Sequence, residues 1–143
     1  VAGGKIRFVG VSNFSIRQLA DAQKYSLNKI VCNQVQYNLL HRDPEKELLV
    51  YCTKNNVILT AYTPLAQGQL ARPPIAALDK IAAKYHKTPI QVALRWLIEK
   101  PQVITIPKAS SKDHIDEILG CLGWKLSNVD QNYLKKSGPD LTF

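Results

Sequence analysis

Residues 102–117 read QVITIPKASSKDHIDE, and this stretch carries the chain from a strand into a helix. Residues 102–106 are rich in β-branched side chains, Pro107 ends the run, and the serine pair that follows opens an amphipathic helix. A helix that begins directly after a strand presents unpaired backbone N–H groups above the strand end. Lys108 adds a positive charge at the same point. The stretch therefore suits a phosphate or another small dianion.

The same residues also have a purely structural explanation. Ser110 and Ser111 can be ordinary helix N-caps, with Asp113 three residues after Ser110 approximating a capping box. Lys108 is then a solvated loop charge. Residue types alone do not decide between an anion-binding site and an ordinary capped helix start, so both remain as alternatives.

The composition predicts a single globular domain. The chain has 143 residues, 45% of them hydrophobic, which is enough for one buried core. It has no run of about 18 apolar residues and no charged-then-apolar leader, so we expect no membrane segment and no secretion. The net charge of +8 is spread among acidic residues along the chain, which disfavours nucleic acid as a partner.

Cysteine usage indicates a reducing compartment. Cys32, Cys52 and Cys121 are odd in number, lie far apart and match no metal-ligand spacing. We therefore predict reduced thiols in or near the core of a cytoplasmic protein, and no metal site.

Short strands and helices are expected to alternate. The predicted strands are residues 6–11, 30–37, 57–62 and 102–106. Six helices are predicted. The first is capped by Ser15 with Gln18 and runs to about Lys24, the second runs from Asp43 as N-cap to about Lys54, and the third covers residues 75–85. The fourth is capped by Thr88 with Gln91, the fifth begins at the serine pair, and the sixth covers residues 127–136 and ends at Gly138.

This alternation predicts an α/β fold with parallel strands and crossover helices. Polar residues collect at or just beyond the C-terminal ends of all four strands, which is the edge where ligands bind in parallel α/β folds. Four βα units make half of an eight-stranded barrel, for which ~250 residues is typical. We therefore expect the chain to form half of a barrel.

Four segments resemble the aldo/keto reductases and occur in that family's order. Residues 4–14 (GKIRFVGVSNF) resemble its fifth strand, 32–38 (CNQVQYN) its sixth, 61–65 (AYTPL) its seventh, and 106–111 (IPKASS) the phosphate-binding end of its eighth. The resemblance implies a (β/α)8 barrel of the TIM type, of which residues 1–143 are the C-terminal half. It also implies an NADP(H)-dependent oxidoreductase that reduces aldehydes and ketones by hydride transfer.

The resemblance implies a set of cofactor contacts. Ser12, Asn13 and Gln34 match positions that hydrogen-bond the nicotinamide carboxamide, and Tyr62 matches the aromatic residue on which the ring stacks. Both Gln34 and Tyr62 also have an alternative explanation without a cofactor. Gln34 can be a polar residue of the barrel interior that bonds to its neighbours, and Tyr62 can be a core tyrosine whose hydroxyl reaches water. The pyrophosphate loop matches Thr63, Leu65 and Gln67. Lys108, Ser110, Ser111 and His114 match the residues that hold the 2′-phosphate of NADP, and Glu117 matches an adenine contact. Ile106 and Ala109 belong to the same cofactor-binding segment.

The chain departs from the family pattern at three of these positions. Ala109 stands where many members have Ser, His114 where many have Arg, and Ile118 where many have Asn. Arginine contacts a phosphate bidentately at any pH, whereas histidine near pH 7 is mostly neutral. We therefore expect NADP(H) as the cofactor, with weaker discrimination against NAD(H) than in an arginine-bearing relative.

The family's reactive residues are Tyr, Lys, Asp and His from the N-terminal half of the barrel, so no catalytic residue is assigned to this chain. A half-barrel exposes two strand edges and an open interior face, and we expect the complementary half or a second copy to cover them. The partner of the complete enzyme is a small carbonyl substrate. Two other hypotheses remain: a non-catalytic nucleotide-binding or regulatory subunit, and a half-barrel assembly module without a ligand.

Overall fold

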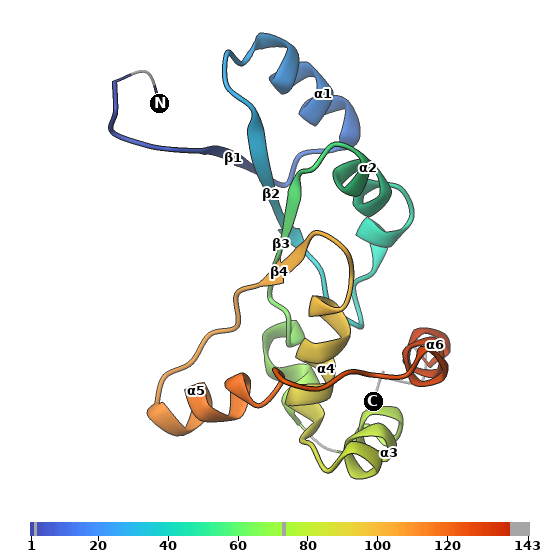
Figure 1. Cartoon of the computed structure of the whole chain (residues 1–143). Coiled ribbons are helices and arrows are strands. Elements are labelled where there is room, and N and C mark those ends of the chain that lie inside the picture. The colour runs from blue at the N-terminus through green and yellow to red at the C-terminus, as the bar shows by residue number, and fades with distance from the viewer. Residues whose placement is uncertain (2, 73, 138–143) are drawn as a thin grey trace.

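The fold is one sheet of four parallel strands with helices packed mainly on one side (Figure 1). The computed structural model describes residues 1, 3–72 and 74–137. In chain order the elements are β1 (Val9–Ser12), α1 (Ile16–Tyr25), β2 (Ile30–Gln36), η1 (Asp43–Glu45), α2 (Leu48–Lys54), β3 (Ile58–Tyr62), η2 (Ala66–Ala71), α3 (Ala76–Tyr85), α4 (Pro89–Ile98), β4 (Val103–Thr105), α5 (Lys112–Leu119) and α6 (Asn128–Lys136). Every helix in these ranges is too short or too polar to cross a membrane.

The sheet confirms the predicted α/β class. Its strands lie in the order β1-β2-β3-β4, and each neighbouring pair is parallel. Successive strands are therefore neighbours in space, joined by crossover helices, as in consecutive βα units of a (β/α)8 barrel. Among the described residues β1 and β4 each pair with one strand only, so the half-barrel has two edges.

Within the described residues, helices cover one face of the sheet and leave the other face without a covering helix. Figure 1 shows α1, α2 and α4 on the same side. The strand register aligns the side chains of the uncovered side, which we call the open face: Ser12 of β1, Cys32, Gln34 and Gln36 of β2, Ile58, Thr60 and Tyr62 of β3, and Ile104 of β4. Across this face the Cys32 thiol and the Thr60 hydroxyl are 3.5 Å apart.

Both predicted capping boxes are present. The Ser15 hydroxyl accepts from the Gln18 backbone N–H, and the Gln18 side chain accepts from the Ser15 N–H. Thr88 and Gln91 make the same reciprocal pair at the start of α4, with Pro89 as the first helical residue. These local patterns are formed by residues three apart, so the sequence alone determines them.

The helix predicted from Asp43 to Lys54 is wrong in its first half. A 3₁₀ turn ends at Glu45, and α2 begins only at Leu48. Asp43 caps nothing, because its carboxylate pairs with the Lys46 ammonium at 2.8 Å. Glu45 instead accepts from the buried Tyr37 hydroxyl at 3.0 Å, just after the end of β2.

Several predicted ends also shift. β1 begins at Val9 rather than Ile6, and β4 begins at Val103 because Gln102 has a φ of 58°, outside the strand region. The N-cap of α5 is Ser111, whose hydroxyl accepts from the His114 N–H, so Ser110 and Asp113 form no capping box. Gly138 lies outside the described residues.

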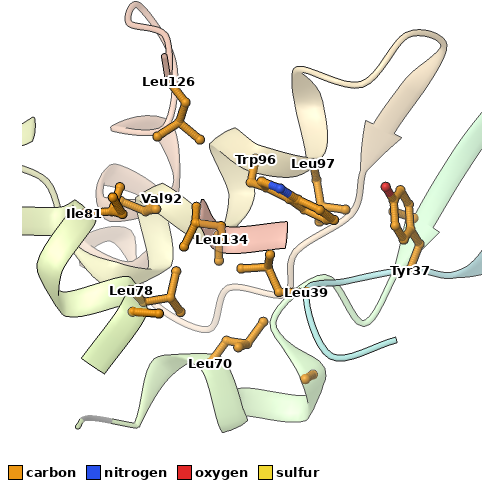
Figure 2. Packing of buried hydrophobic residues seen from close by; sticks show 14 of the residues in the cluster. Tyr37, Leu39, Leu70, Leu78, Ile81, Val92, Trp96, Leu97, Leu126 and Leu134 are labelled. Atoms are coloured by element: carbon orange, nitrogen blue, oxygen red, sulfur yellow. The ribbon is translucent and has the colours of Figure 1, made fainter. Parts of the chain in front are cut away.

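The main core lies between the sheet and helices α3, α4 and α6. Figure 2 shows Trp96 of α4 beside Tyr37, and their rings meet edge to face with centroids 5.7 Å apart. Leucine, isoleucine and valine side chains fill the remaining volume, among them Leu39, Leu70, Leu78, Ile81, Val92, Leu97 and Leu134. This core fixes α4, and with it the segments that follow β3 and β4.

Asp130 joins α6 to α3. Its carboxylate is buried at 5% exposure and accepts from the Lys84 ammonium at 2.7 Å and the Ser127 hydroxyl at 2.6 Å, as well as from the Tyr85 hydroxyl. Burial opposes ionisation, but the hydrogen bonds from Lys84, Ser127 and Tyr85 outweigh it and lower the pKa of Asp130 to about 2.

We therefore predict that Asp130 makes stability depend on pH between about 4 and 2. Because its pKa is near 3.9 in an unfolded chain, the ionised group contributes roughly 2 kcal/mol above that pH, and the contribution is lost as the pH falls through 2. Asp130→Asn should lower the free energy of unfolding in urea by about this amount at pH 7. The two proteins should converge near pH 2, and a constant difference between them would contradict the assignment.

Candidate functional site

A cavity of about 640 Å³ opens at the C-terminal ends of β3 and β4. Its walls are the segment after β3, the segment after β4, the first turn of α4 and one side of α5. The lining residues are Thr63, Pro64, Leu65, Gln67, Gly68, Ala71, Ile90, Ile106, Pro107, Lys108, His114, Glu117 and Ile118. Most of these side chains are apolar, and Lys108 and His114 come from the segment after β4 and from α5, so the cavity suits a ligand with an apolar part and an anionic part.

The segment after β3 has a strained backbone. Thr63, Ala66 and Gln67 have φ values of 47°, 49° and 56°, in the left-handed region that residues other than glycine rarely adopt. Asn38 is 1% exposed and donates its amide to the Thr63 carbonyl at 2.9 Å, which holds the first turn. The Thr63 hydroxyl is buried and has no hydrogen-bond partner among the described residues. Several left-handed residues in one short loop are typical of a functional site.

The opposite wall is the positively charged start of α5. The first turn of α5 directs backbone N–H groups toward the segment that carries Lys108, and Ser111 caps it. Lys108 is exposed and takes part in none of the ion pairs between described residues. Ser110 Oγ lies 3.3 Å from Nδ1 of His114. An anion placed here would meet a cation, hydroxyls and N–H groups together.

A second polar group lies at the ends of β1 and β2. The Ser12 hydroxyl donates to the Gln34 carbonyl at 3.0 Å, and the Asn13 N–H donates to the same oxygen at 2.8 Å. Asn13 has a φ of 58°, and the neighbouring turn is held by buried Asn33, which bonds both backbone groups of Phe14. Ser12 pairs in register with Gln34, so both side chains stand on the open face.

The structure therefore divides the predicted site residues into two groups. Those that line the cavity together are Thr63, Leu65, Gln67, Ile106, Lys108, His114 and Glu117. Those outside it are Ser12, Asn13, Gln34 and Tyr62 on the β1–β3 side, and Ala109, Ser110 and Ser111 in the segment before α5. Both groups lie at the C-terminal edge of the sheet, as predicted. Their roles as cofactor contacts stay predictions.

Part of the cavity wall, and the residues that support it, were not predicted from the sequence. Ala71 and Ile90 line the cavity, but small and apolar side chains carry no chemical signal in a sequence. Pro64, Gly68 and Pro107 adjoin recognised motifs, and their neighbours could have indicated them. Asn33 and Asn38 support the two loops, and a buried amide directly after or within a strand is the signal that could have found them.

Comparison with known proteins identifies the family. The sequence pattern described as the aldo/keto reductase family matches residues 1–138. Glyoxal reductase from Bacillus subtilis is 36% identical over 137 residues, which cover 96% of this chain and 48% of the reductase. The chain thus spans about half the length of the curated relatives that it matches.

Solved structures agree with this identification. A thermostable aldo-keto reductase in complex with the inhibitor epalrestat is 42% identical, with a TM-score of 0.89 over 94% of this chain and 50% of that one. An aldo/keto reductase from Klebsiella pneumoniae in complex with NADP and acetate is 31% identical, with a TM-score of 0.87 over 96% and 50%. The four βα units match half of a (β/α)8 barrel in these proteins. This chain belongs to the aldo/keto reductase family.

Proposed function

We propose that residues 1–143 are the C-terminal, NADP(H)-binding half of an enzyme that reduces aldehydes or ketones to alcohols. One observation carries the proposal: at the ligand edge of a parallel sheet, the cavity joins apolar walls to a helix N-terminus and to a lysine that forms no ion pair with any described residue. Relatives with known structures were solved with NADP or NADPH, which supports the same cofactor here.

The residues present fit this cofactor. The strained loop that carries Thr63, Leu65 and Gln67 lines the cavity, and it would lie along the pyrophosphate. Lys108, with Ser110, Ser111 and His114, would hold the 2′-phosphate, and Glu117 would contact the adenine. Glu117 is the only carboxylate among the cavity residues that the structure describes.

The open face would hold the nicotinamide. Gln34 offers both a donor and an acceptor to the ring's carboxamide, Ser12 and Asn13 stand beside it, and Tyr62 follows on the neighbouring strand at a position suited to stacking. The bound nicotinamide supplies the hydride for carbonyl reduction. In this chain the residues bind and orient it, and none of them is proposed to exchange a proton with the substrate.

We propose that the open face and the edges of β1 and β4 are covered by the N-terminal half of the barrel, which also supplies the reactive residues. Two observations support this partner: the chain spans about half the length of its relatives, and Ile104 on the edge strand is 49% exposed. Parallel strands seldom remain uncovered on one face, because both faces of such sheets are normally buried.

A cytoplasmic location is also proposed. Cys32, Cys52 and Cys121 are all free thiols. Burial, with a smaller contribution from nearby Cys32, raises the pKa of the Cys52 thiol to about 11, and burial also raises the pKa of Cys121. Thiols in such surroundings are unreactive and remain reduced in a reducing compartment.

A titration with both cofactors tests the proposal. Because a charge-assisted contact is worth about 1.5–3 kcal/mol, we expect NADPH to bind roughly 10- to 100-fold more tightly than NADH, as measured by quenching of tryptophan fluorescence. The preference should be smaller than in a relative that has arginine at the His114 position. Equal affinities for NADPH and NADH would refute the 2′-phosphate assignment.

A further inference from the structure

Helix α5 forms one wall of the cavity without being anchored in the core. It contributes His114, Glu117 and Ile118 to the lining, yet none of its own residues is buried. Two of its apolar side chains, Ile115 and Leu119, are 50% and 53% exposed. A helix of eight residues is not stable by itself, so another contact must fix the distance of this wall from the rest of the cavity.

That contact is made by Gln91 in the first turn of α4. Its side-chain oxygen accepts from the Thr88 backbone N–H at 3.1 Å, which closes the capping box. Its side-chain nitrogen donates to the backbone carbonyl of Glu117 at 3.0 Å, which joins α4 to α5. The oxygen of the Gln91 amide therefore caps α4, and its nitrogen bonds to α5. The neighbouring Ile90 lines the same cavity.

Gly120 makes this contact possible. A Cβ atom at Gly120 would lie 2.1 Å from the Gln91 side-chain nitrogen, so only glycine lets the amide reach α5. The Gly120 carbonyl also accepts from the Trp124 indole N–H at 3.0 Å, which holds the chain as it leaves the helix. The end of α5 is thus fixed from both sides, and Gln91 is the side chain that connects it to α4.

We propose that Gln91 is a positioning residue for the adenosine end of the cofactor. By bonding to the Glu117 carbonyl, it sets the separation between α5 and the first turn of α4, whose Ile90 also lines the cavity, and so the width of the cavity. Gln91 itself touches no cofactor atom in this proposal. The inference depends on the proposed function, because it assumes that NADP(H) is the ligand of the cavity.

Gln91→Glu separates the two roles of the amide. A glutamate oxygen still accepts from the Thr88 N–H, as in the usual capping box, but it cannot donate to the Glu117 carbonyl and places a negative charge beside it. The loss of one such hydrogen bond predicts affinity for 2′,5′-ADP and for NADPH roughly 3- to 10-fold lower than in the unaltered chain. Amide hydrogens of α5 should exchange faster, while those of α4 should not change.

Thr88→Ala is the matched control, because it removes the cap hydroxyl and leaves the donor to Glu117 in place. It should lower the melting temperature without changing 2′,5′-ADP affinity. If Gln91→Glu does not fold, Gly120→Ala breaks the same contact from the other side and should reproduce the affinity loss. Unchanged affinity in the folded variant would overturn the inference. Failure of the unaltered chain to bind NADPH or 2′,5′-ADP would instead overturn the proposed function.

Discussion

The chain alone is expected to oxidise NADPH in the presence of an aldehyde at least about 10⁴-fold more slowly than a full-length relative. A positioned general acid contributes ~10²- to 10⁴-fold to such a reaction, and orientation of the carbonyl contributes more. By the family resemblance both tasks fall to residues of the N-terminal half. The titratable side chains that line the cavity, Lys108, His114 and Glu117, stand at its adenosine end, away from the proposed nicotinamide position.

Adding the N-terminal half of a relative, such as glyoxal reductase from B. subtilis, should restore turnover. We expect a one-to-one complex on gel filtration and NADPH oxidation within it, with the full-length relative assayed in parallel. Ile104→Lys should prevent the complex, because it places a charge on the open face of edge strand β4. Val50→Lys is the matched control, since Val50 on α2 is also 49% exposed but lies on the helix side of the sheet.

Two outcomes would change the assignment. Turnover by the chain alone at the rate of a full-length relative would show that reactive residues lie within residues 1–143. A complex that forms and binds NADPH but remains inactive would favour the alternative of a nucleotide-binding or regulatory half-barrel. Val50→Lys and Ile104→Lys with equal effects would contradict the open face as the docking surface.

The fold was predictable wherever the information is local. The capping boxes at Ser15 and Thr88 depend on residues three apart, and the alternation of strands with helices determines parallel pairing. The first turn of the predicted helix after Asp43 failed for the opposite reason. There Glu45 accepts from Tyr37, which lies 8 residues earlier, just after β2, and the helix-capping pattern does not include that partner.

The sequence predicted where the candidate site lies, but it did not predict the backbone conformation or the side-chain contacts within the site. Polar residues after each strand indicated the correct edge of the sheet, because the C-terminal ends of parallel strands meet at one edge. The left-handed backbone at Thr63, Ala66 and Gln67 could not be predicted, since none of these residues is a glycine. The contact between Gln91 and Glu117 joins residues 26 apart in the chain, and the capping motif had already explained Gln91.

Lys108→Ala is expected to weaken NADPH binding by roughly 10- to 100-fold and to leave NADH binding nearly unchanged. The reason is charge: the 2′-phosphate is the group by which NADPH differs from NADH, and Lys108 is the lysine among the described residues that line the cavity. The fluorescence titration with both cofactors measures the change.

Lys112→Ala tests whether the effect comes from contact or from net charge. Lys112 is exposed at the first position of α5, has the same charge as Lys108 and does not line the cavity. If Lys108 contacts the phosphate, Lys112→Ala should change NADPH affinity by no more than about twofold, and raised salt should reduce even that change. Equal losses in the two variants would mean that the cofactor responds to the surface field of a basic chain, and that Lys108 makes no specific contact with the phosphate.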